Sequence, residues 1–551
     1  MKFALAQINP TVGDFSGNIS KILSFSQRAE AAGADLVIFP EMSLCGYPPA
    51  DLLEKPIFLE RAQQGMQQLA AATAGHRTAM LVGYPAPAEG PGKRVKNCAA
   101  LLRNGEVAFV QTKMLLPYYD VFDEQRYFKP AEQQDIFACG GSRLAISICE
   151  DAWNDKNFWP VRLYPVDPLE RLMAQGADVI LNISASPYSA GKRQVREEML
   201  AAIARQYQRP VLLVNQVGGN DSLLFDGTSL VFDANGTLRA RGRSFEEDLL
   251  LVDFPAASPT PSNVPAMESE DAAAYHGLVM GVRDYVRKCG FSRAIIGLSG
   301  GIDSALVAVI AADALGPENV LGIGMPGPYS SAGSLEDAEA LARNLGIEWR
   351  TVPIGSLFTQ YQDDLAPLFA GRAPDITEEN LQSRIRGTLL MAVANKQSAL
   401  VLTTGNKSEM STGYCTLYGD MVGALAVIGD VYKTAVYRLA AYVNREQERI
   451  PVPTLQKPPS AELRPGQRDT DSLPPYEVLD PVLEAYIERR ESAEEITSQM
   501  AGRLTLPEVR SILRKVERSE YKRQQAAPVL KVTAKAFGFG RRFPIAARTD
   551  F

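Results

Sequence analysis

Residues 297–304, Gly-Leu-Ser-Gly-Gly-Ile-Asp-Ser, have the residue types of an anion-binding turn. The apolar run 294–297 leads into the turn, and a helix is expected to open at Asp303 and Ser304. At such a junction, converging backbone N–H groups and the helix dipole favour a negatively charged ligand. Gly300 and Gly301 permit positive φ angles and let a phosphate approach the backbone. The run therefore predicts a phosphate site, and the alternative is an ordinary strand-to-helix turn.

No lysine follows this turn, which separates it from the Walker type of phosphate loop. The run resembles the pyrophosphatase loop of the ATP-pyrophosphatase enzymes, which cleave ATP to AMP and pyrophosphate. The resemblance implies that the hydroxyl groups of Ser299 and Ser304 join the backbone amides around the leaving pyrophosphate. The ATP-binding residues that it implies here are Gly297, Leu298, Ser299, Gly300, Gly301, Ile302, Asp303 and Ser304.

Three residues of the first half follow apolar stretches: Glu41 after 36–40, Lys113 after 109–112 and Cys149 after 144–148. Taken singly, each has an ordinary structural explanation. A cysteine after a strand is commonly a buried small residue, and a Glu or Lys at a strand end is commonly exposed or ion-paired. The chain contains only His76 and His276, so histidine-based nucleophilic catalysis and zinc binding are disfavoured.

Together, these three residues and their neighbours resemble the nitrilase/amidase superfamily over roughly residues 1–250. The motifs that carry the resemblance are Phe39-Pro40-Glu41, Lys113 with Leu115-Leu116-Pro117, and Cys149-Glu150-Asp151. It implies that Cys149 attacks an amide carbonyl, that Glu41 passes the thiol proton to the departing ammonia, and that Lys113 stabilises the oxyanion. It also implies a site for L-glutamine formed by Tyr119, Ser186 and Lys192, with Glu124 as a supporting acid that orients Lys113.

The second half offers further polar residues near the ends of apolar stretches. Thr404 and Glu409 follow the expected strand 399–403, and Lys433 and Asn380 lie in two other polar segments. Asp303 and Glu409 could share Mg²⁺ between phosphates because hard oxygen ligands suit that ion. Lys433 would meet phosphate charge. Each of these residues alone is equally compatible with a polar surface.

As a set they resemble NAD synthetase over about residues 270–551, together with the segments 457–467 and 519–523. The resemblance implies that Thr404 contacts ATP and that Asn380, Glu409 and Lys522 contact deamido-NAD⁺. It implies a reaction in which the nicotinate carboxylate of deamido-NAD⁺ attacks the α-phosphate of ATP, the co-substrate. Ammonia then displaces AMP from the adenylate to form the amide.

Alternating apolar and helical stretches must position these groups. Strands are expected at 2–8, 36–39, 78–83 and 98–103, and helices at 20–32, 61–72, 271–288, 483–490 and 506–516. Such alternation indicates an α/β protein. The proline-rich stretch 254–265 has linker composition. We therefore predict a domain at 1–255, a linker at 256–269 and a domain at 270–551. The two resemblances imply a nitrilase-like αββα sandwich, then a Rossmann-like doubly wound parallel sheet of the ATP-pyrophosphatase type.

The composition of the whole chain bounds its partners and location. The 551 residues carry a formal charge of −7, which disfavours nucleic acid as the main partner. The sequence contains neither a signal-like N-terminus nor an apolar run of membrane-spanning length, so no membrane association is expected. Its six cysteines form no C-x-x-C pair and indicate reduced thiols in the cytoplasm.

The order of the two halves resembles the glutamine-dependent NAD synthetase family. This resemblance implies that ammonia released at Cys149 travels through an enclosed passage to the adenylate, and that the chain forms homo-oligomers. Two alternatives stay open. The chain could be another glutamine-dependent ligase with a different acid substrate, or the second half could be a nucleotide-sensing module that regulates the amidase.

Overall fold

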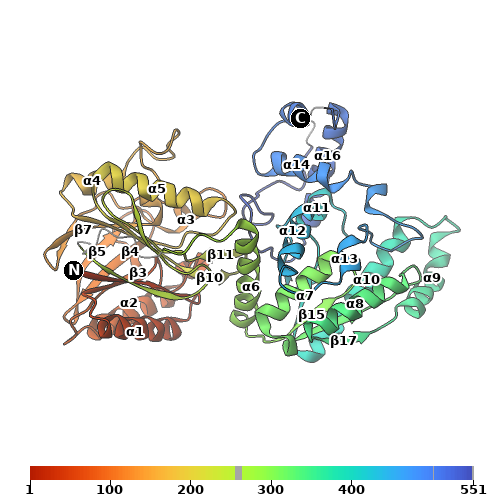
Figure 1. Ribbon diagram of the computed structural model, residues 1–551, viewed down its shortest axis with the longest axis horizontal. Helices are drawn as coiled ribbons and strands as arrows, with labels where there is room; N and C mark the ends of the chain where they lie inside the picture. The colour runs from red at the N-terminus through yellow and green to blue at the C-terminus, as the bar shows by residue number, and fades with distance from the viewer. Residues whose placement is uncertain (255–263, 501, 549–551) are drawn as a thin grey trace. The chain divides into compact units, whose positions relative to one another are not determined.

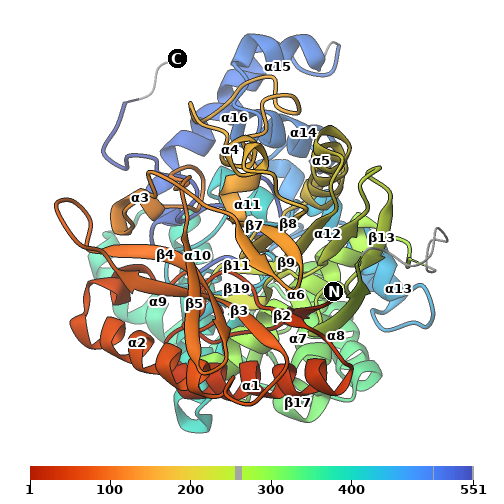
Figure 2. The ribbon, with the colours of Figure 1, turned by 90° about the vertical axis from the view of Figure 1, so that its left-hand side faces the viewer.

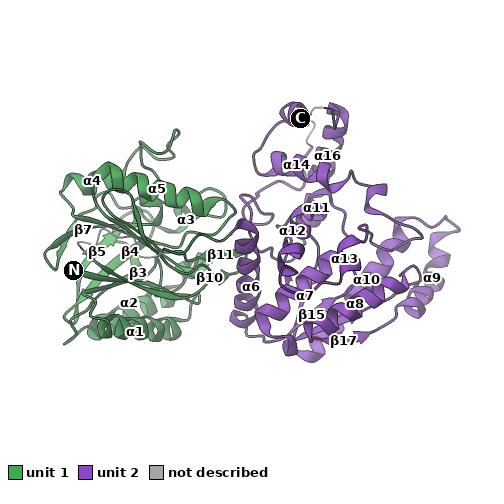
Figure 3. Cartoon of the chain, viewed as in Figure 1, with its two compact units in different colours: residues 1–268 green, residues 269–551 purple. Residues whose placement is uncertain are grey.

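The computed structural model describes residues 1–254, 264–500 and 502–548. It divides the chain into two compact units, Met1–Glu268 and Ser269–Phe551 (Figure 3). Residues 255–263, which include residues 256–263 of the predicted linker, lie outside the described residues. Each unit has its own hydrophobic cores.

Two six-stranded sheets form the middle of the first unit. In spatial order, the first sheet contains β14 (Asp248–Asp253), β1 (Lys2–Gln7), β2 (Leu36–Ile38), β3 (Ala79–Pro87), β4 (Val95–Arg103) and β5 (Glu106–Thr112). The second contains β13 (Leu238–Arg241), β12 (Leu230–Phe232), β9 (Val211–Asn215), β8 (Val179–Ser184), β7 (Ser142–Ile148) and β6 (Phe137–Cys139). A separate hairpin pairs β10 (Val217–Asn220) with β11 (Leu223–Asp226).

Helices cover the outer faces of both sheets (Figures 1 and 2). Helices α1 (Phe15–Ala31) and α2 (Pro56–Ala71) pack on the first sheet, and α4 (Pro168–Ala174) and α5 (Lys192–Tyr207) pack on the second. Successive strand residues face opposite sides. In β1, Phe3 and Leu5 enter the core between the sheets, whereas Ala4 and Ala6 face the helices. The predicted αββα sandwich is therefore confirmed.

The second unit is built on one parallel five-stranded sheet. Its strands, in spatial order, are β17 (Glu348–Thr351), β16 (Val320–Gly324), β15 (Ala294–Gly297), β18 (Leu400–Thr403) and β19 (Leu425–Ala426). The order reverses between β15 and β18. In open parallel sheets, ligands bind at the carboxyl ends of the strands beside such a reversal. The turn 298–301 follows β15, and Thr404 follows β18.

The sheet of the second unit has helices on both faces, as predicted. Helices α7 (Ile302–Leu315) and α8 (Ala332–Leu345) form the crossovers that follow β15 and β16. Helices α9 (Gly355–Phe369) and α10 (Ile376–Gln397) share a core with the other face. The remaining helices of eight residues or more in this unit are α6 (Glu270–Lys288), α12 (Lys433–Val443), α14 (Tyr476–Ile487) and α16 (Leu506–Arg518).

Several element boundaries differ from those expected from the sequence. Helix α2 begins at Pro56 rather than near 61, because proline is well accommodated at the first helical position. Helix α14 begins at Tyr476, seven residues before the expected start, and continues through Pro481. Throughout the described ranges, the helices are all too short or too polar to cross a membrane.

Candidate active sites in the two units

Cys149 lies at the carboxyl end of β7, where the strand passes into a short 3₁₀ turn, Cys149–Ala152. Its φ angle is +44°, which is a left-handed conformation. A residue other than glycine adopts it at a cost of about 1–3 kcal/mol and keeps it only where the surroundings impose it. Next along the turn, Asp151 accepts hydrogen bonds from the N–H groups of Met114 (3.1 Å) and Leu115 (2.8 Å). The strained turn is thus tied to the segment that follows Lys113.

Lys113 is fully buried between two carboxylates. Its Nζ donates hydrogen bonds to Oε1 of Glu41 at 2.7 Å and to Oε1 of Glu124 at 2.8 Å. Glu41 follows β2, Lys113 follows β5, and Glu124 begins the short helix α3 (Glu124–Tyr127). The structure therefore brings together three residues that lie far apart in the sequence.

Two residues that the sequence analysis missed complete the hydrogen bonds of these carboxylates. Asn97 Nδ2 donates to Glu41 Oε1 at 2.6 Å, and Tyr47 OH donates to Glu124 Oε1 at 2.9 Å. The second oxygen of Glu41 accepts the backbone N–H of Ala185 at 3.0 Å. A polar side chain inside the apolar strand β4 was the only available sign for Asn97; nothing in the sequence singled out Tyr47.

Burial and neighbouring charges shift the pKa values in this site. Burial raises the pKa of the Cys149 thiol, Glu41 raises it further, and Lys113 opposes the rise. Burial also raises the pKa of Glu124, to about 7, with Lys113 acting against burial. Burial disfavours the charged form of Lys113, but Glu124 and Glu41 outweigh it and raise the pKa of this lysine. A raised pKa keeps a thiol protonated, so a nucleophilic role for Cys149 would require a general base.

The residues predicted to bind glutamine lie around this centre. Tyr119 OH donates to both carboxylate oxygens of Glu150, at 3.0 Å each, and Glu150 is the neighbour of Cys149. Ser186 is buried and follows Ala185, whose N–H holds Glu41. Lys192 Nζ lies 5.2 Å from the ring centroid of Trp153 and donates to the Pro187 carbonyl at 3.1 Å.

In the second unit, the turn after β15 has the geometry of a phosphate cradle. Gly300 has a φ angle of +79°, and a Cβ atom there would overlap the backbone of Ser334. The hydroxyl groups of Ser299 and Ser304 lie 3.2 Å apart, and the N–H of Gly301 donates to Ser299 Oγ at 3.2 Å. Helix α7 begins at Ile302, so its N-terminus faces this turn. Position 300 therefore requires glycine.

Lys433 also lies between two carboxylates. It forms an ion pair with Asp303 Oδ2, and its Nζ lies 3.7 Å from Glu409 Oε1. Asn406, which the sequence analysis missed, donates to Asp303 Oδ1 at 3.0 Å and caps the helix that carries Glu409. Burial raises the pKa of Glu409 to about 8, and Asp303 adds to the rise while Lys433 opposes it.

A cavity of about 390 Å³ brings the predicted residues of the second unit together. Lys522 Nζ donates to the carbonyls of Gly413 (2.8 Å) and Cys415 (2.7 Å), and Asn380 Oδ1 accepts a hydrogen bond from Thr416 at 2.7 Å. Every residue predicted to bind ATP or deamido-NAD⁺, except Gly300, lines this cavity: Gly297, Leu298, Ser299, Gly301, Ile302, Asp303, Ser304, Asn380, Thr404, Glu409, Lys433 and Lys522. Lys457 and Glu462, from the segment 457–467, line it as well.

The carboxylates of this cavity fit a divalent cation that would be held jointly by the protein and by the phosphates of a bound substrate. Burial raises the pKa of Glu409, and the nearby Asp303 carboxylate adds to the rise. Within the described ranges, no three Cys, His, Asp or Glu side chains cluster as a complete protein-built metal site. Mg²⁺ is commonly held by one or two carboxylates and completed by substrate phosphates and water. The pair Asp303 and Glu409 satisfies that requirement.

Both halves of the chain match families of known proteins. Residues 2–260 match the carbon-nitrogen hydrolase family, and residues 274–526 match the NAD synthase family. The glutamine-dependent NAD(+) synthetase of Synechocystis sp. is 50% identical over 552 residues, which cover 98% of each chain. That of Thermotoga maritima is 45% identical over 588 residues, which cover 100% of this chain and 99% of the relative.

Solved structures extend this similarity to three dimensions. The structure of glutamine-dependent NAD+ synthetase from Acinetobacter baumannii in complex with ADP has a TM-score of 0.77 at 41% identity, covering 99% of this chain and 98% of that one. Each family match covers one of the two units, and the similarity to the relatives extends over nearly the whole chain. The chain belongs to the glutamine-dependent NAD(+) synthetase family.

Proposed function

We propose that this chain converts deamido-NAD⁺ to NAD⁺ with ATP and L-glutamine, releasing AMP, pyrophosphate and glutamate. The observation that carries the proposal is the presence, in one chain, of two complete sites in two compact units. One has an enclosed cysteine with a carboxylate and a lysine. The other has a phosphate cradle that opens into a cavity. The first suits release of ammonia from an amide, and the second suits activation of a carboxylate.

In the first unit, Cys149 Sγ attacks the side-chain amide carbon of glutamine while Glu41 accepts the thiol proton. Lys113 stabilises the negative charge on the carbonyl oxygen. Glu41 then delivers the proton to the departing ammonia, and a thioester remains on Cys149. Water, activated by Glu41, cleaves the thioester to glutamate and restores the thiol. Glu124 holds Lys113 in place through its 2.8 Å hydrogen bond.

In the second unit, the nicotinate carboxylate attacks the α-phosphorus of ATP, and the bond to pyrophosphate breaks. The turn 298–301 and Lys433 hold the pyrophosphate as its charge develops. Ammonia then attacks the acyl carbon of the adenylate, and AMP leaves. Asp303 and Glu409 would hold Mg²⁺, which would supply positive charge to the phosphates. Thr404 contacts ATP, and Asn380 and Lys522 contact deamido-NAD⁺.

Replacement of the nucleophile tests the division of labour. Cys149→Ala is expected to abolish NAD⁺ synthesis with glutamine and to leave synthesis with ammonium salts within about twofold, because only the first half-reaction uses the thiol. Cys139→Ala, which removes another buried thiol of the same unit, is the matched control. Loss of both activities in Cys149→Ala would contradict the proposal.

Pyrophosphate release separates the proposal from its alternatives. With ATP and glutamine, deamido-NAD⁺ is expected to elicit pyrophosphate release, and other carboxylic acids are not. Release with a different acid would identify another glutamine-dependent ligase, and ATP binding without release would identify a sensing module. Cytoplasmic location and homo-oligomer formation stay predictions, tested by fractionation and by mass measurement in solution.

A further inference from the structure

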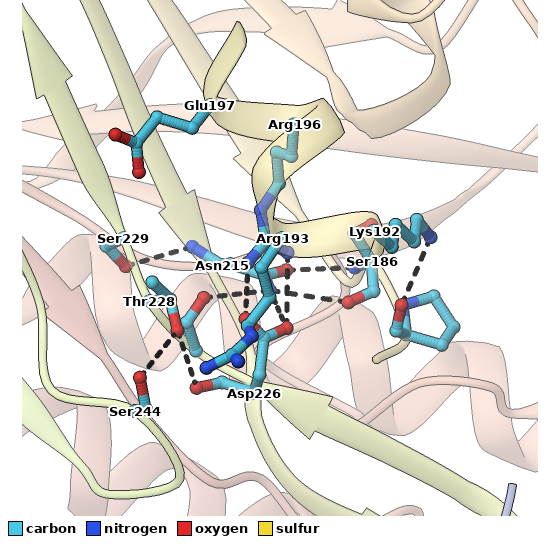
Figure 4. A network of polar contacts seen from close by, with 12 residues as sticks. Ser186, Lys192, Arg193, Arg196, Glu197, Asn215, Asp226, Thr228, Ser229 and Ser244 are labelled. Carbon is cyan, nitrogen blue, oxygen red and sulfur yellow. Dashed lines mark hydrogen bonds and ion pairs between the residues drawn. The ribbon is translucent and has the colours of Figure 1, made fainter. Parts of the chain in front are cut away.

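A fully buried ion pair joins helix α5 to the hairpin β10–β11 in the first unit (Figure 4). Arg196, on α5, uses both terminal nitrogens to contact the two carboxylate oxygens of Asp226, the last residue of β11; Nη1 lies 3.2 Å from Oδ1. The side chains are 2% and 0% exposed, respectively. Neither residue belongs to the reacting groups described above.

Asn215, at the end of β9, connects this pair to the segment that carries Ser186. Its Nδ2 lies 3.5 Å from Asp226 Oδ1 and donates to the Gly227 carbonyl at 3.0 Å. The same side chain contacts both backbone polar groups of Ser186. Oδ1 accepts its N–H at 2.9 Å, and Nδ2 donates to its carbonyl at 3.3 Å. The backbone of Ser186 is therefore fixed by Asn215, whose amide is held in turn by the Gly227 carbonyl, immediately after Asp226, and lies 3.5 Å from the Asp226 carboxylate.

Two consequences for the glutamine site follow from this connectivity. The N–H of Ala185, immediately before Ser186, donates to the second carboxylate oxygen of Glu41 at 3.0 Å. Lys192 precedes Arg196 by four residues on α5, so the two lie on one side of the helix one turn apart. Asp226 is thereby connected to Lys192 through Arg196 on the same helix, and to Ser186 through Asn215. The peptide 185–186 extends the second connection to Glu41.

We infer that Asp226, with Arg196 and Asn215, forms a positioning unit that sets Ser186, Lys192 and the Ala185 amide for glutamine. This inference rests on the proposed glutaminase function of the first unit. A buried ion pair contributes little net stability compared with well-packed apolar residues of the same volume. Its bidentate geometry instead fixes distance and angle. The three residues act through others and touch no reacting atom.

Asp226→Asn in the full chain tests the inference, because it keeps the shape of the side chain and removes its charge. Misplacement of substrate-positioning groups costs about 100-fold in efficiency. We expect kcat/KM for glutamine to fall about 100-fold, chiefly through a higher KM, while ammonia-dependent synthesis stays within about twofold. Asp233→Asn, which loses the ion pair with Arg239 in the same unit, is the matched control and is expected to leave the KM for glutamine unchanged.

Asn215→Ser provides a second variant that leaves no buried charge unpaired. We expect it to raise the KM for glutamine and to lower kcat, because the peptide that holds both Ser186 and Glu41 is released. Near-UV circular dichroism at the assay temperature, calibrated against a thermal unfolding curve, measures the folded fraction of every variant. A structural role alone would lower kcat in proportion to that fraction and leave KM unchanged. A KM within about twofold of the wild type in both variants would overturn the inference.

The proposed function itself is decided by other measurements. If wild-type protein uses glutamine and Cys149→Ala uses only ammonium, the function stands whatever the result for Asp226. If the wild type fails to use glutamine, the failure belongs to the proposed function and not to the positioning unit.

Discussion

Each unit of this chain holds a lysine between two carboxylates, but the two trios differ in their access to solvent. In the first unit, the side chains of Lys113, Glu41 and Glu124 are 0%, 0% and 4% exposed. In the second, those of Lys433, Asp303 and Glu409 are 3%, 19% and 18% exposed. The lysines are equally buried. The carboxylates of the second trio instead face a cavity of about 390 Å³.

This difference separates two uses of the same charges. In the enclosed trio, Lys113 Nζ contacts the two carboxylates at 2.7 and 2.8 Å, and burial and Glu41 raise the pKa of the Cys149 thiol. In the open trio, Glu409 Oε1 lies 3.7 Å from Lys433 Nζ, and burial, with Asp303 adding to it, raises the pKa of Glu409 to about 8. An open carboxylate pair suits a cation that arrives with its phosphates. Under the proposed function, the same residue types would serve covalent catalysis in the first unit and phosphoryl chemistry in the second.

The largest effect is expected from Lys113→Met. Loss of the oxyanion contact, together with two adjacent carboxylates left without their cation, is expected to lower the glutamine-dependent rate about 10³-fold. The ammonia-dependent rate is expected to change less than about twofold, since the second unit keeps its trio. Steady-state assays with each nitrogen source measure both. An equal loss in the two assays would show that the trios are not independent.

Lys433→Met is expected to lower both rates about 100-fold, because adenylation is common to the two nitrogen sources. Pyrophosphate release without any nitrogen source isolates the adenylation step. The same loss should appear there. If synthesis with ammonium is spared while synthesis with glutamine falls, the assignment of Lys433 to the phosphates is wrong.

Gly300→Ala tests the phosphate cradle of the second unit, which is formed by the turn 298–301. A Cβ at this left-handed position would overlap the backbone of Ser334, so the turn must shift. We expect both rates to fall about tenfold or more, in line with about 1–3 kcal/mol of local strain. The control is Gly333→Ala, where a Cβ would meet no atom within 4 Å. Glutaminase activity measured as glutamate release should persist in both variants.

The smallest effect concerns the pH dependence of stability in the enclosed trio. Burial raises the pKa of Glu124 from its usual value of about 4.5 to about 7. Between these values, the folded state holds a proton that the unfolded state has lost, so the free energy of unfolding falls as the pH rises. Glu124→Gln removes this dependence. Its unfolding temperature, relative to the wild type, should therefore rise by a few degrees between pH 5 and pH 7.5.

Calorimetry of the first unit's unfolding transition would measure this shift. A constant difference between Glu124→Gln and the wild type across that pH range would show that Glu124 has the same protonation in both states.

Local signals in the sequence predict the α/β fold class and single out most of the candidate site residues. The turn at 297–304 is recognisable because its glycines and hydroxyls are contiguous. Apolar stretches that alternate with helical ones predict an α/β fold. Within a strand such as β1, successive residues face two different cores, as Phe3 and Ala4 do. Asn97 and Asp226 were missed because a polar residue in or beside an apolar strand does not reveal which distant group it contacts, and Asn406 was missed because it lies among other polar residues.

Residue types and spacing alone predicted a phosphate-binding turn at 297–304 and disfavoured histidine as a partner of the cysteine. Resemblance to known families then supplied the roles. Only the tertiary structure decided that Lys113 lies between Glu41 and Glu124 in an enclosed site, and that Lys433 lies between Asp303 and Glu409 beside a cavity. The reason is physical: burial and charge separation, which set pKa values, depend on neighbours that lie dozens of residues away.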